Sequence, residues 1–281
     1  MKRVWRCGRF EMPLGDTLVM GIINVTPDSF SDGGEHADTD AAIAHGRLMV
    51  ADGAAIIDVG GESTRPGAAE LSEAEETARV LPVISQLAEG ASFPVSIDTR
   101  HAEVARCAVE AGASIVNDVG GFRDAGMAEF AASADVGVVI MHMLGEPGTM
   151  QEDPRYDDVV GEVRDFLLDR ALSLEGAGVA RERICIDPGI GFGKTLEHNL
   201  LLLGALPELS SFGYPVLVGA SRKRFIGMLG GAEEPRHRIG GSIAAAVWAA
   251  ATGASAVRVH DVRETVEALR VASAIRDSSG R

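Results

Sequence analysis

Polar side chains follow several short apolar segments of this sequence, and they include the residues best suited to chemistry. Asp98, Asn117 and Asp187 offer carboxylate and amide oxygens. These oxygens suit a heterocycle with amino and ring N–H donors on one edge, because a carboxylate makes a paired, charge-assisted contact with such an edge. Lys223 could donate to a ring carbonyl or ring nitrogen on the other edge. The set therefore predicts a pocket for a flat heterocycle.

A second set of residues is cationic and predicts a phosphate site. Arg258 and His260 are two residues apart in an expected strand, so their side chains face the same way. With Asn24 they predict a cradle for phosphate oxygens, and Arg65 belongs to the same cationic group. We expect Mg²⁺ to accompany the phosphate, because this ion takes oxygen ligands.

The segment 219–227 adds a third candidate. We expect a helix to begin near Ser221, where free N–H groups would bind a phosphate or a substrate carboxylate. A surface basic cluster beside a helix cap is the alternative for this segment. The stretch 188–195 is not a P-loop, because Pro188 stands where that motif needs glycine. Phe192 in this stretch could wall a flat ligand.

Other polar or aromatic residues have simpler explanations. We expect His142 to be a strand-end histidine with an ordinary hydrogen bond rather than a catalytic base. Glu73, Glu75 and Glu76 predict a solvated helix face. Trp248 predicts packing on an outer helix, including contact between subunits.

The first expected strand leads directly into a polar stretch. The apolar run 18–25 is short and bounded by Pro27, which is typical of a strand buried on both faces in a parallel sheet. After it, the chain is too polar and glycine-rich to pack well. We therefore expect a mobile loop that closes over substrates. This loop comprises Thr26, Pro27, Asp28, Ser29, Phe30, Ser31 and Asp32.

Strand-like and helix-like segments alternate along the whole chain. The expected strands are 19–24, 56–60, 95–98, 115–119, 138–142, 184–187, 216–219 and 256–260. The expected helices are 40–51, 73–87, 102–111, 127–134, 159–177, 196–205, 240–251 and 262–275. Asp40 and the capping-box pair Ser72 and Glu75 are the signals for two helix starts.

One junction recurs where a helix closes and a strand opens, with glycine at the helix end. A polar strand residue follows five positions after each glycine. The three pairs are Gly53 with Asp58, Gly112 with Asn117, and Gly253 with Arg258. The repeat indicates copies of one βα unit.

Eight such units without a linker predict an α/β fold, a TIM (β/α)8 barrel over residues 17–276. Residues 1–16 are expected to form a short N-terminal hairpin near the bottom of the barrel, and 277–281 a frayed tail. An open doubly wound sheet is the second choice, but it would more naturally show a glycine-rich turn after the first strand.

Composition narrows the range of partners. The net charge of −15 disfavours nucleic acid and anionic membrane surfaces. No apolar run reaches the roughly 18 residues of a membrane span, and the N-terminus lacks a signal peptide. Three scattered cysteines fit a reducing compartment. We expect a cytoplasmic protein that acts on small molecules.

Several long segments together resemble the dihydropteroate synthase family. The matching segments are 21–34, 58–67, 96–99, 116–118, 187–194, 219–227 and 258–260. The resemblance implies condensation of 6-hydroxymethyl-7,8-dihydropterin diphosphate with 4-aminobenzoate, with release of diphosphate. It also implies a homodimer, and a site that sulfonamides occupy by mimicking 4-aminobenzoate.

The resemblance further assigns roles to residues. Asp98, Asn117, Asp187 and Lys223 would hold the pterin. Asn24, Arg258 and His260 would handle the diphosphate, with Mg²⁺ at Asn24. The aminobenzoate side would be formed by Thr64, Arg65, Pro66, Phe192 and Ser221.

Two other functions remain open at this point. One is a barrel that transfers a methyl group from methyltetrahydrofolate, which has no need for the phosphate cradle of Arg258 and His260. The other is a non-catalytic pterin-binding paralogue, in which the stretches 24–34 and 64–66 would be expected to have eroded. Both stretches look complete.

Overall fold

The computed structural model describes residues 3–25, 35–62 and 71–278, and the side chains of residues 35–38 are not described. Two short strands come first, β1 (Val4–Cys7) and β2 (Phe10–Pro13). The remaining strands are β3 (Leu18–Asn24), β4 (Ile56–Gly60), β5 (Val95–Asp98), β6 (Ile115–Asp118), β7 (Gly137–Met141), β8 (Ile184–Asp187), β9 (Leu217–Val218) and β10 (Ala256–Val259). The α-helices are α1 (Glu35–Ala51), α2 (Glu73–Ala88), α3 (Ala102–Glu110), α4 (Ala125–Ser133), α5 (Val159–Gly176), α6 (Leu196–Gly204), α7 (Leu206–Ser211), α8 (Arg224–Gly230), α9 (Ile239–Ala251) and α10 (Val262–Ser278).

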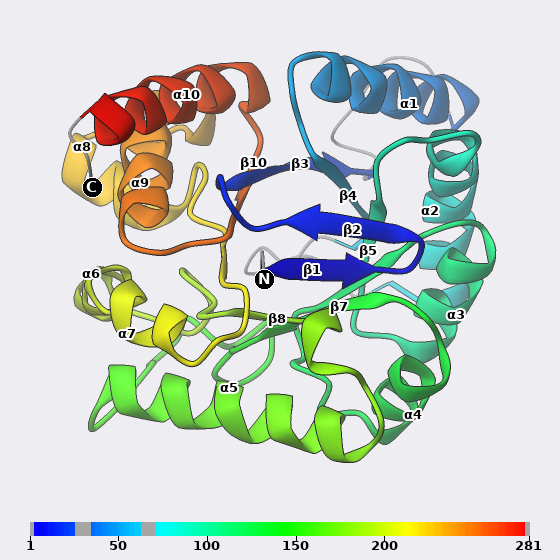
Figure 1. Ribbon diagram of the computed structural model, residues 1–281, viewed down its shortest axis with the longest axis horizontal. Helices are drawn as coiled ribbons and strands as arrows, with labels where there is room; N and C mark the ends of the chain where they lie inside the picture. Colours follow the sequence, from blue (N-terminus) through cyan, green and yellow to red (C-terminus); the bar gives the residue numbers. More distant parts are fainter. Residues whose placement is uncertain (1–2, 26–34, 63–70, 279–281) are drawn as a thin grey trace.

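The strands β3 to β10 form one parallel sheet that closes on itself. Its order is β8-β7-β6-β5-β4-β3-β10-β9. A parallel bridge between Ile186 and Val216 joins the two ends of this order, and the Ile186 N–H donates to the Pro215 carbonyl at 2.9 Å. The helices surround the sheet (Figure 1). The predicted (β/α)8 barrel is thus confirmed, and the open doubly wound sheet is excluded.

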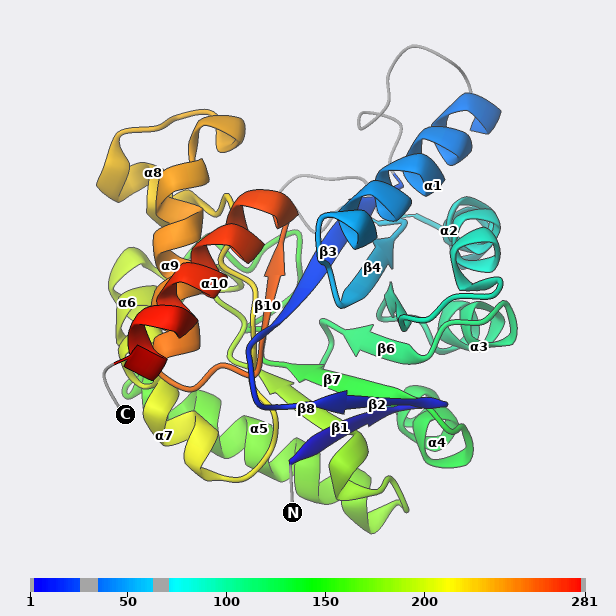
Figure 2. The same cartoon turned by 45° about the horizontal axis from the view of Figure 1, so that its top comes forward.

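The N-terminal hairpin of β1 and β2 covers one end of the barrel (Figures 1 and 2). Trp5 and Cys7 are fully buried against an apolar layer inside the barrel. This floor layer consists of Met20, Ile56, Ile115, Val139, Cys185, Leu217 and Ala256. The Trp5 indole N–H donates to the Arg183 carbonyl at 3.0 Å, which satisfies the buried polar end of the ring. The predicted hairpin is confirmed.

The repeated glycine junction has the conformation that the sequence predicted. Gly53, Gly112 and Gly253 have φ angles of 104°, 113° and 112°, a region that side chains disfavour. Each of these glycines follows a helix end and precedes a strand that enters the barrel. The repeat therefore places Asp58, Asn117 and Arg258 at equivalent heights in their strands.

Some helix boundaries differ from the prediction. The helix α1 begins at Glu35, so Asp40 is an interior residue of this helix. The helix α8 begins at Arg224, and Ser221 lies in the turn before it. The short helix α7 was not predicted. The capping box of α2 is present as expected, with Ser72 and Glu75 bonded to each other's backbone N–H groups. Within the described residues, no helix has the length and apolar character that crossing a membrane requires.

Candidate functional site

Polar side chains form a ring inside the barrel, above the apolar floor layer. Asp58, Asn117, Asp187 and Arg258 each come two residues after a floor-layer residue of the same strand. Because side chains alternate along a strand, they point into the barrel as the floor residues do. Asp98 at the end of β5 completes the set, which we call the polar ring. The strand ends predicted as the site are thus brought together.

Arg258 is the centre of this ring. Its Nε lies 2.6 Å from Asp58 Oδ2, and its Nη2 lies 2.6 Å from Asp98 Oδ2. Asn117 Nδ2 also donates to Asp58 Oδ2, at 3.3 Å. Asp58 therefore contacts both of the other positions that the glycine repeat made equivalent, Asn117 and Arg258. The sequence had given Asp58 no role, although the residue belongs to that repeat and begins the matching segment 58–67.

These contacts change the expectation for Arg258, which the sequence placed on the phosphate side alone. Its guanidinium is bound by two carboxylates on the side where the heterocycle is expected. The two ion pairs use Nε and one Nη2 hydrogen, and a guanidinium has five donors in total. Arg258 therefore lies between the two predicted chemistries rather than in one of them.

Burial shifts the pKa values of the acidic groups upward. It raises the pKa of Asp98 to about 7, although Arg258 opposes this rise. It raises the pKa of Asp187 as well, and Lys223 opposes that rise. For Arg258, burial alone would lower the pKa, but Asp58 and Asp98 raise it overall. The ring is thus a low-dielectric site in which an added donor or cation would be strongly attracted.

Lys223 lies close enough to Asp187 for the two charges to interact, and it follows β9, the strand beside the end of β8. Burial lowers its pKa to about 8, although Asp187 favours the charged form. The Lys223 ammonium bonds to the Ile190 carbonyl and lies 4.4 Å from the centre of the Phe192 ring. Asp187 Oδ1 accepts from the Gly189 N–H at 2.7 Å. The glycine-rich loop after β8 therefore fixes both the anion and the cation that a heterocycle would meet.

Lys194 anchors this same loop, and the sequence gave it no role. It is 3% exposed, and its ammonium lies 3.0 Å from His142 Nδ1 and 3.0 Å from the Phe192 carbonyl. Burial lowers the pKa of Lys194 to about 7 and that of His142 to about 3. His142 is therefore a neutral hydrogen-bonding partner, as expected, and is not suited to act as a base at neutral pH.

Ser221 and His260 meet between the loop after β9 and the end of β10. The Ser221 hydroxyl lies 3.1 Å from His260 Nδ1 and accepts the His260 backbone N–H at 3.2 Å. Ser221 is buried, with 7% of its surface exposed. A predicted phosphate residue and a predicted carboxylate-binding residue are therefore neighbours.

The prediction of a solvated face for Glu73, Glu75 and Glu76 is wrong for Glu76. This side chain is 1% exposed, and among the described residues neither of its carboxylate oxygens has a hydrogen-bond partner within 3.5 Å, the His101 Nε2 lying 3.9 Å from Oε2. Burial raises its pKa to about 7, with Glu62 adding to the rise. Glu76 lies under the end of β4, where the tertiary fold covers a face that is polar in sequence.

The remaining predicted site residues are Asn24, which the structure describes, and two segments that lie outside the described residues. Asn24 ends β3 and is half-buried. Thr64, Arg65 and Pro66 lie outside the described residues, as does the predicted loop from Thr26 to Asp32. The described part of the site is therefore the polar ring, the loop after β8 and the turn between β9 and α8.

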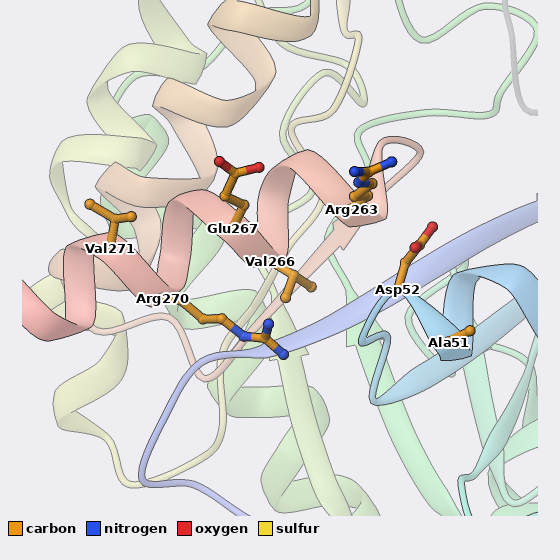
Figure 3. A pocket seen from close by; sticks show the side chains of 7 residues that line it. All are labelled: Ala51, Asp52, Arg263, Val266, Glu267, Arg270 and Val271. Atoms are coloured by element: carbon orange, nitrogen blue, oxygen red, sulfur yellow. The ribbon is translucent and has the colours of Figure 1, made fainter.

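Two surface hollows lie outside the barrel. One, with a volume of about 420 Å³, lies between the end of α1 and α10 (Figure 3). Its lining includes Asp52, Arg263, Glu267 and Arg270, and none of the polar-ring residues. A second hollow of about 590 Å³ lies between α6, α8 and α9. Neither hollow contains the strand-end chemistry.

The fold and the site together define a (β/α)8 barrel enzyme with buried acidic, amide and cationic side chains gathered inside the barrel. The family model described as pterin binding enzyme matches residues 20–260. Dihydropteroate synthase of Escherichia coli (strain K12) is 51% identical over 94% of this chain and 93% of that protein. Dihydropteroate synthase of Neisseria meningitidis serogroup C is 48% identical over 98% of both chains.

Solved structures agree with these matches. Xanthomonas albilineans dihydropteroate synthase with 4-aminobenzoic acid has a TM-score of 0.93 and 48% identity, covering 98% of this chain and 99% of that chain. The same organism's enzyme in complex with 7,8-dihydropteroate has a TM-score of 0.89 and 46% identity, covering 97% of this chain and 98% of that one. The chain belongs to the pterin-binding enzyme family, and its predicted resemblance to the dihydropteroate synthases is confirmed.

Proposed function

We propose that this protein is a transferase that condenses 6-hydroxymethyl-7,8-dihydropterin diphosphate with 4-aminobenzoate, giving 7,8-dihydropteroate and diphosphate. The observation that carries the proposal is the polar ring, in which Asp98, Asn117 and Asp187 present acceptors inside the barrel while Lys223 faces them. The relatives named above are dihydropteroate synthases rather than methyltransferases. This supports the condensation over methyl transfer.

The pterin would lie flat across the polar ring. Its amino group and ring N–H would donate to Asp187 and Asn117, and Lys223 would donate to the opposite edge. Phe192 borders this space, since its ring lies 4.4 Å from the Lys223 ammonium. The floor layer and the hairpin exclude water from below, which strengthens each of these contacts.

The diphosphate would lie at the rim, near Asn24, Arg258 and His260. Among the residues that the structure describes, no group of three or more His, Cys, Asp or Glu could hold a metal ion alone. Mg²⁺ usually takes one or two protein oxygens and completes its shell with water and substrate phosphates. The amide oxygen of Asn24 fits such an ion. When bound, Mg²⁺ would neutralise charge on the leaving diphosphate.

The 4-aminobenzoate would bind above the pterin, with its carboxylate near the Ser221 hydroxyl. Thr64, Arg65, Pro66 and Phe192 are proposed to complete this side. The amine nitrogen of 4-aminobenzoate is neutral at pH 7 and can attack the pterin methylene carbon without a strong base. His142 does not supply one, because its pKa is about 3. The residues of this chain therefore act by positioning the two substrates and by stabilising charge.

Charge stabilisation falls chiefly on the polar ring. As the bond between the pterin methylene carbon and the diphosphate oxygen breaks, the methylene becomes electron-poor. Asp98 in its ionised form would stabilise that carbon, and Arg258 favours this form by its contact at 2.6 Å, against the burial that raises the pKa of Asp98 to about 7. Arg258 has further donors for the departing diphosphate.

The experiment is to mix both substrates with the purified protein and Mg²⁺ and to measure diphosphate release. We expect release that requires both substrates and that a sulfonamide inhibits competitively with 4-aminobenzoate. Diphosphate release without 4-aminobenzoate would indicate a hydrolase. Pterin binding without any release would indicate the non-catalytic paralogue.

We further propose a homodimer and a cytoplasmic location. The hollow between α6, α8 and α9 is flanked by exposed Leu200, Leu229 and Trp248, which are 44%, 60% and 53% exposed. Large apolar side chains that gather on a surface favour a protein interface. Light scattering should then give twice the chain mass, and Trp248→Glu should give the monomer. Cys7, Cys107 and Cys185 are free thiols, which fits a reducing compartment.

A further inference from the structure

The turn between β9 and α8 carries Ser221 and Lys223, and the residue between them has an unusual backbone. Arg222 has a φ angle of 59°, in the left-handed region. An L-residue with a side chain adopts this region only at a cost, so its neighbours must hold it there. Residues held in this way often lie at functional sites.

Three neighbours hold Arg222. Its Nε lies 3.0 Å from Asp261 Oδ2, and its Nη2 lies 2.5 Å from Asp261 Oδ1, so the pair is bidentate. Its backbone N–H donates to Ser242 Oγ at 2.9 Å. Arg238 Nη1 donates to its carbonyl at 2.9 Å. Both backbone groups and the side chain are therefore fixed at once, which determines the turn.

The ion pair joins two strand-end loops. Asp261 directly follows His260, and the Ser221 hydroxyl lies 3.1 Å from His260 Nδ1. The side chains of Arg222 and Asp261 are only 30% and 10% exposed, so solvent screens the pair less than it would at an open surface. The loop after β9 and the loop after β10 are thus connected twice, by this ion pair and by the Ser221–His260 contact.

We infer that Arg222 and Asp261 are positioning residues, which hold Ser221 and Lys223 in register with His260. Neither residue is assigned a contact with substrate; each acts through its neighbours. The inference rests on the proposed function, since it takes Ser221 as part of the 4-aminobenzoate site and Lys223 as part of the pterin site. One ion pair would then set the relative position of the two substrates.

The test uses substitutions at position 222 that separate the ion pair from the backbone conformation. Arg222→Ala removes the pair and keeps a Cβ, so the left-handed turn loses its support. Arg222→Gly also removes the pair, but glycine adopts this conformation without a steric cost. We expect kcat/KM to fall about 100-fold in the alanine variant, as for a misplacement of about 1 Å. We expect the glycine variant to recover about tenfold of this loss.

Asp261→Asn provides a second, nearly isosteric change if the alanine variant does not fold. The matched control is Glu175→Gln, which weakens the Arg181–Glu175 ion pair of 2.9 Å at the hairpin end of the barrel. Asp261→Asn should raise the KM for 4-aminobenzoate and lower kcat, while Glu175→Gln should alter neither. Equal kinetic constants for Asp261→Asn and Glu175→Gln would overturn the inference, as would equal losses in the alanine and glycine variants.

Hydrogen exchange of residues 217–226 separates this inference from the proposed function, because it requires no turnover. Asp261→Asn should exchange at least tenfold faster than wild type in this segment, and Glu175→Gln should not. Unchanged exchange would overturn the positioning role even if the enzyme is active. A wild-type protein that releases no diphosphate would refute the proposed function, whatever the exchange shows.

Discussion

Asp187→Asn should weaken pterin binding strongly while leaving the fold intact. Asp187 Oδ1 accepts the Gly189 N–H at 2.7 Å, so Oδ2 is the oxygen that would meet the ligand. In the variant, the amide oxygen is expected to keep the Gly189 bond, which turns the NH₂ group toward the ligand. A donor would then face the donor edge of the pterin.

The magnitude follows from these two losses. A hydrogen bond to a charged group contributes about 1.5–3 kcal/mol, and an unsatisfied buried donor costs about 1–3 kcal/mol. The sum, about 2.5–6 kcal/mol, corresponds to an affinity roughly 10²- to 10⁴-fold weaker. Isothermal titration calorimetry with the dihydropterin substrate measures it directly.

Asp187→Asn should increase the stability of the protein at high pH, although it weakens binding. Burial raises the pKa of Asp187, so between its unfolded and folded pKa values the folded protein binds more protons than the unfolded chain. The wild type therefore loses stability as the pH rises through this window, and the asparagine variant lacks that loss. The stability of the variant minus that of the wild type, measured by thermal unfolding, should be larger at pH 8 than at pH 4. Unchanged affinity would refute the pairing of Asp187 with the pterin edge, and a loss of stability at pH 8 would refute the account of its burial.

Three further predictions concern other described residues. Ser221→Ala should raise the KM for 4-aminobenzoate about tenfold, as expected for one hydrogen bond to a carboxylate, and leave the KM for the pterin unchanged; an effect on the pterin alone would move Ser221 out of that site. Arg258→Lys keeps the charge but loses the two-pronged contact with Asp58 and Asp98, so rapid-quench kinetics should show diphosphate release slowed at least about tenfold; a normal rate would leave no role for the fork. Glu76 has a folded pKa of about 7 against an ordinary 4.5, so the free energy of unfolding of the wild type should fall by about 2.5 kcal/mol between pH 5 and pH 8. Glu76→Gln should abolish that difference in urea unfolding; the same pH dependence of stability in the two proteins would contradict it.

The order of strands and helices was predictable because a parallel barrel buries both faces of each strand. Such strands appear as short apolar runs, and Ile56–Gly60, Val95–Asp98 and Ile184–Asp187 match the expected bounds. The strand β9 is shorter than expected, since only Leu217 and Val218 have the ladder pairing of a strand. Apolar character predicts burial, but pairing depends on neighbouring strands that the local sequence does not contain.

The membership of the polar ring was largely predictable, and its connections were not. Strand-end position and residue type brought Asp98, Asn117 and Asp187 into one group. The ion pairs of Arg258 depend on the register between β10, β4 and β5, which is set by the closure of the whole barrel. Sequence pattern alone could not show that Arg258 would meet Asp58, 200 residues away.

The burial of Glu76 was unpredictable for a related reason. Three glutamates near the start of a helix normally stabilise its N-terminus in contact with water. Ser72 and Glu75 do form that capping box, but Glu76 turns under the end of β4 and becomes almost fully buried. Helical periodicity identifies a face, but the strand that covers it comes from the tertiary fold.

The hairpin of β1 and β2 closes one end of the barrel. Among the described residues, Trp5 and Cys7 fill the lower opening, which leaves the opposite end as the approach to the polar ring. In the proposed reaction, the pterin binds deeper in the barrel than 4-aminobenzoate. It must therefore bind first, because bound 4-aminobenzoate would block the pterin from reaching the polar ring. The depth of each binding position would then determine the order of substrate binding. The dihydropteroate could leave only after the diphosphate at the rim had dissociated.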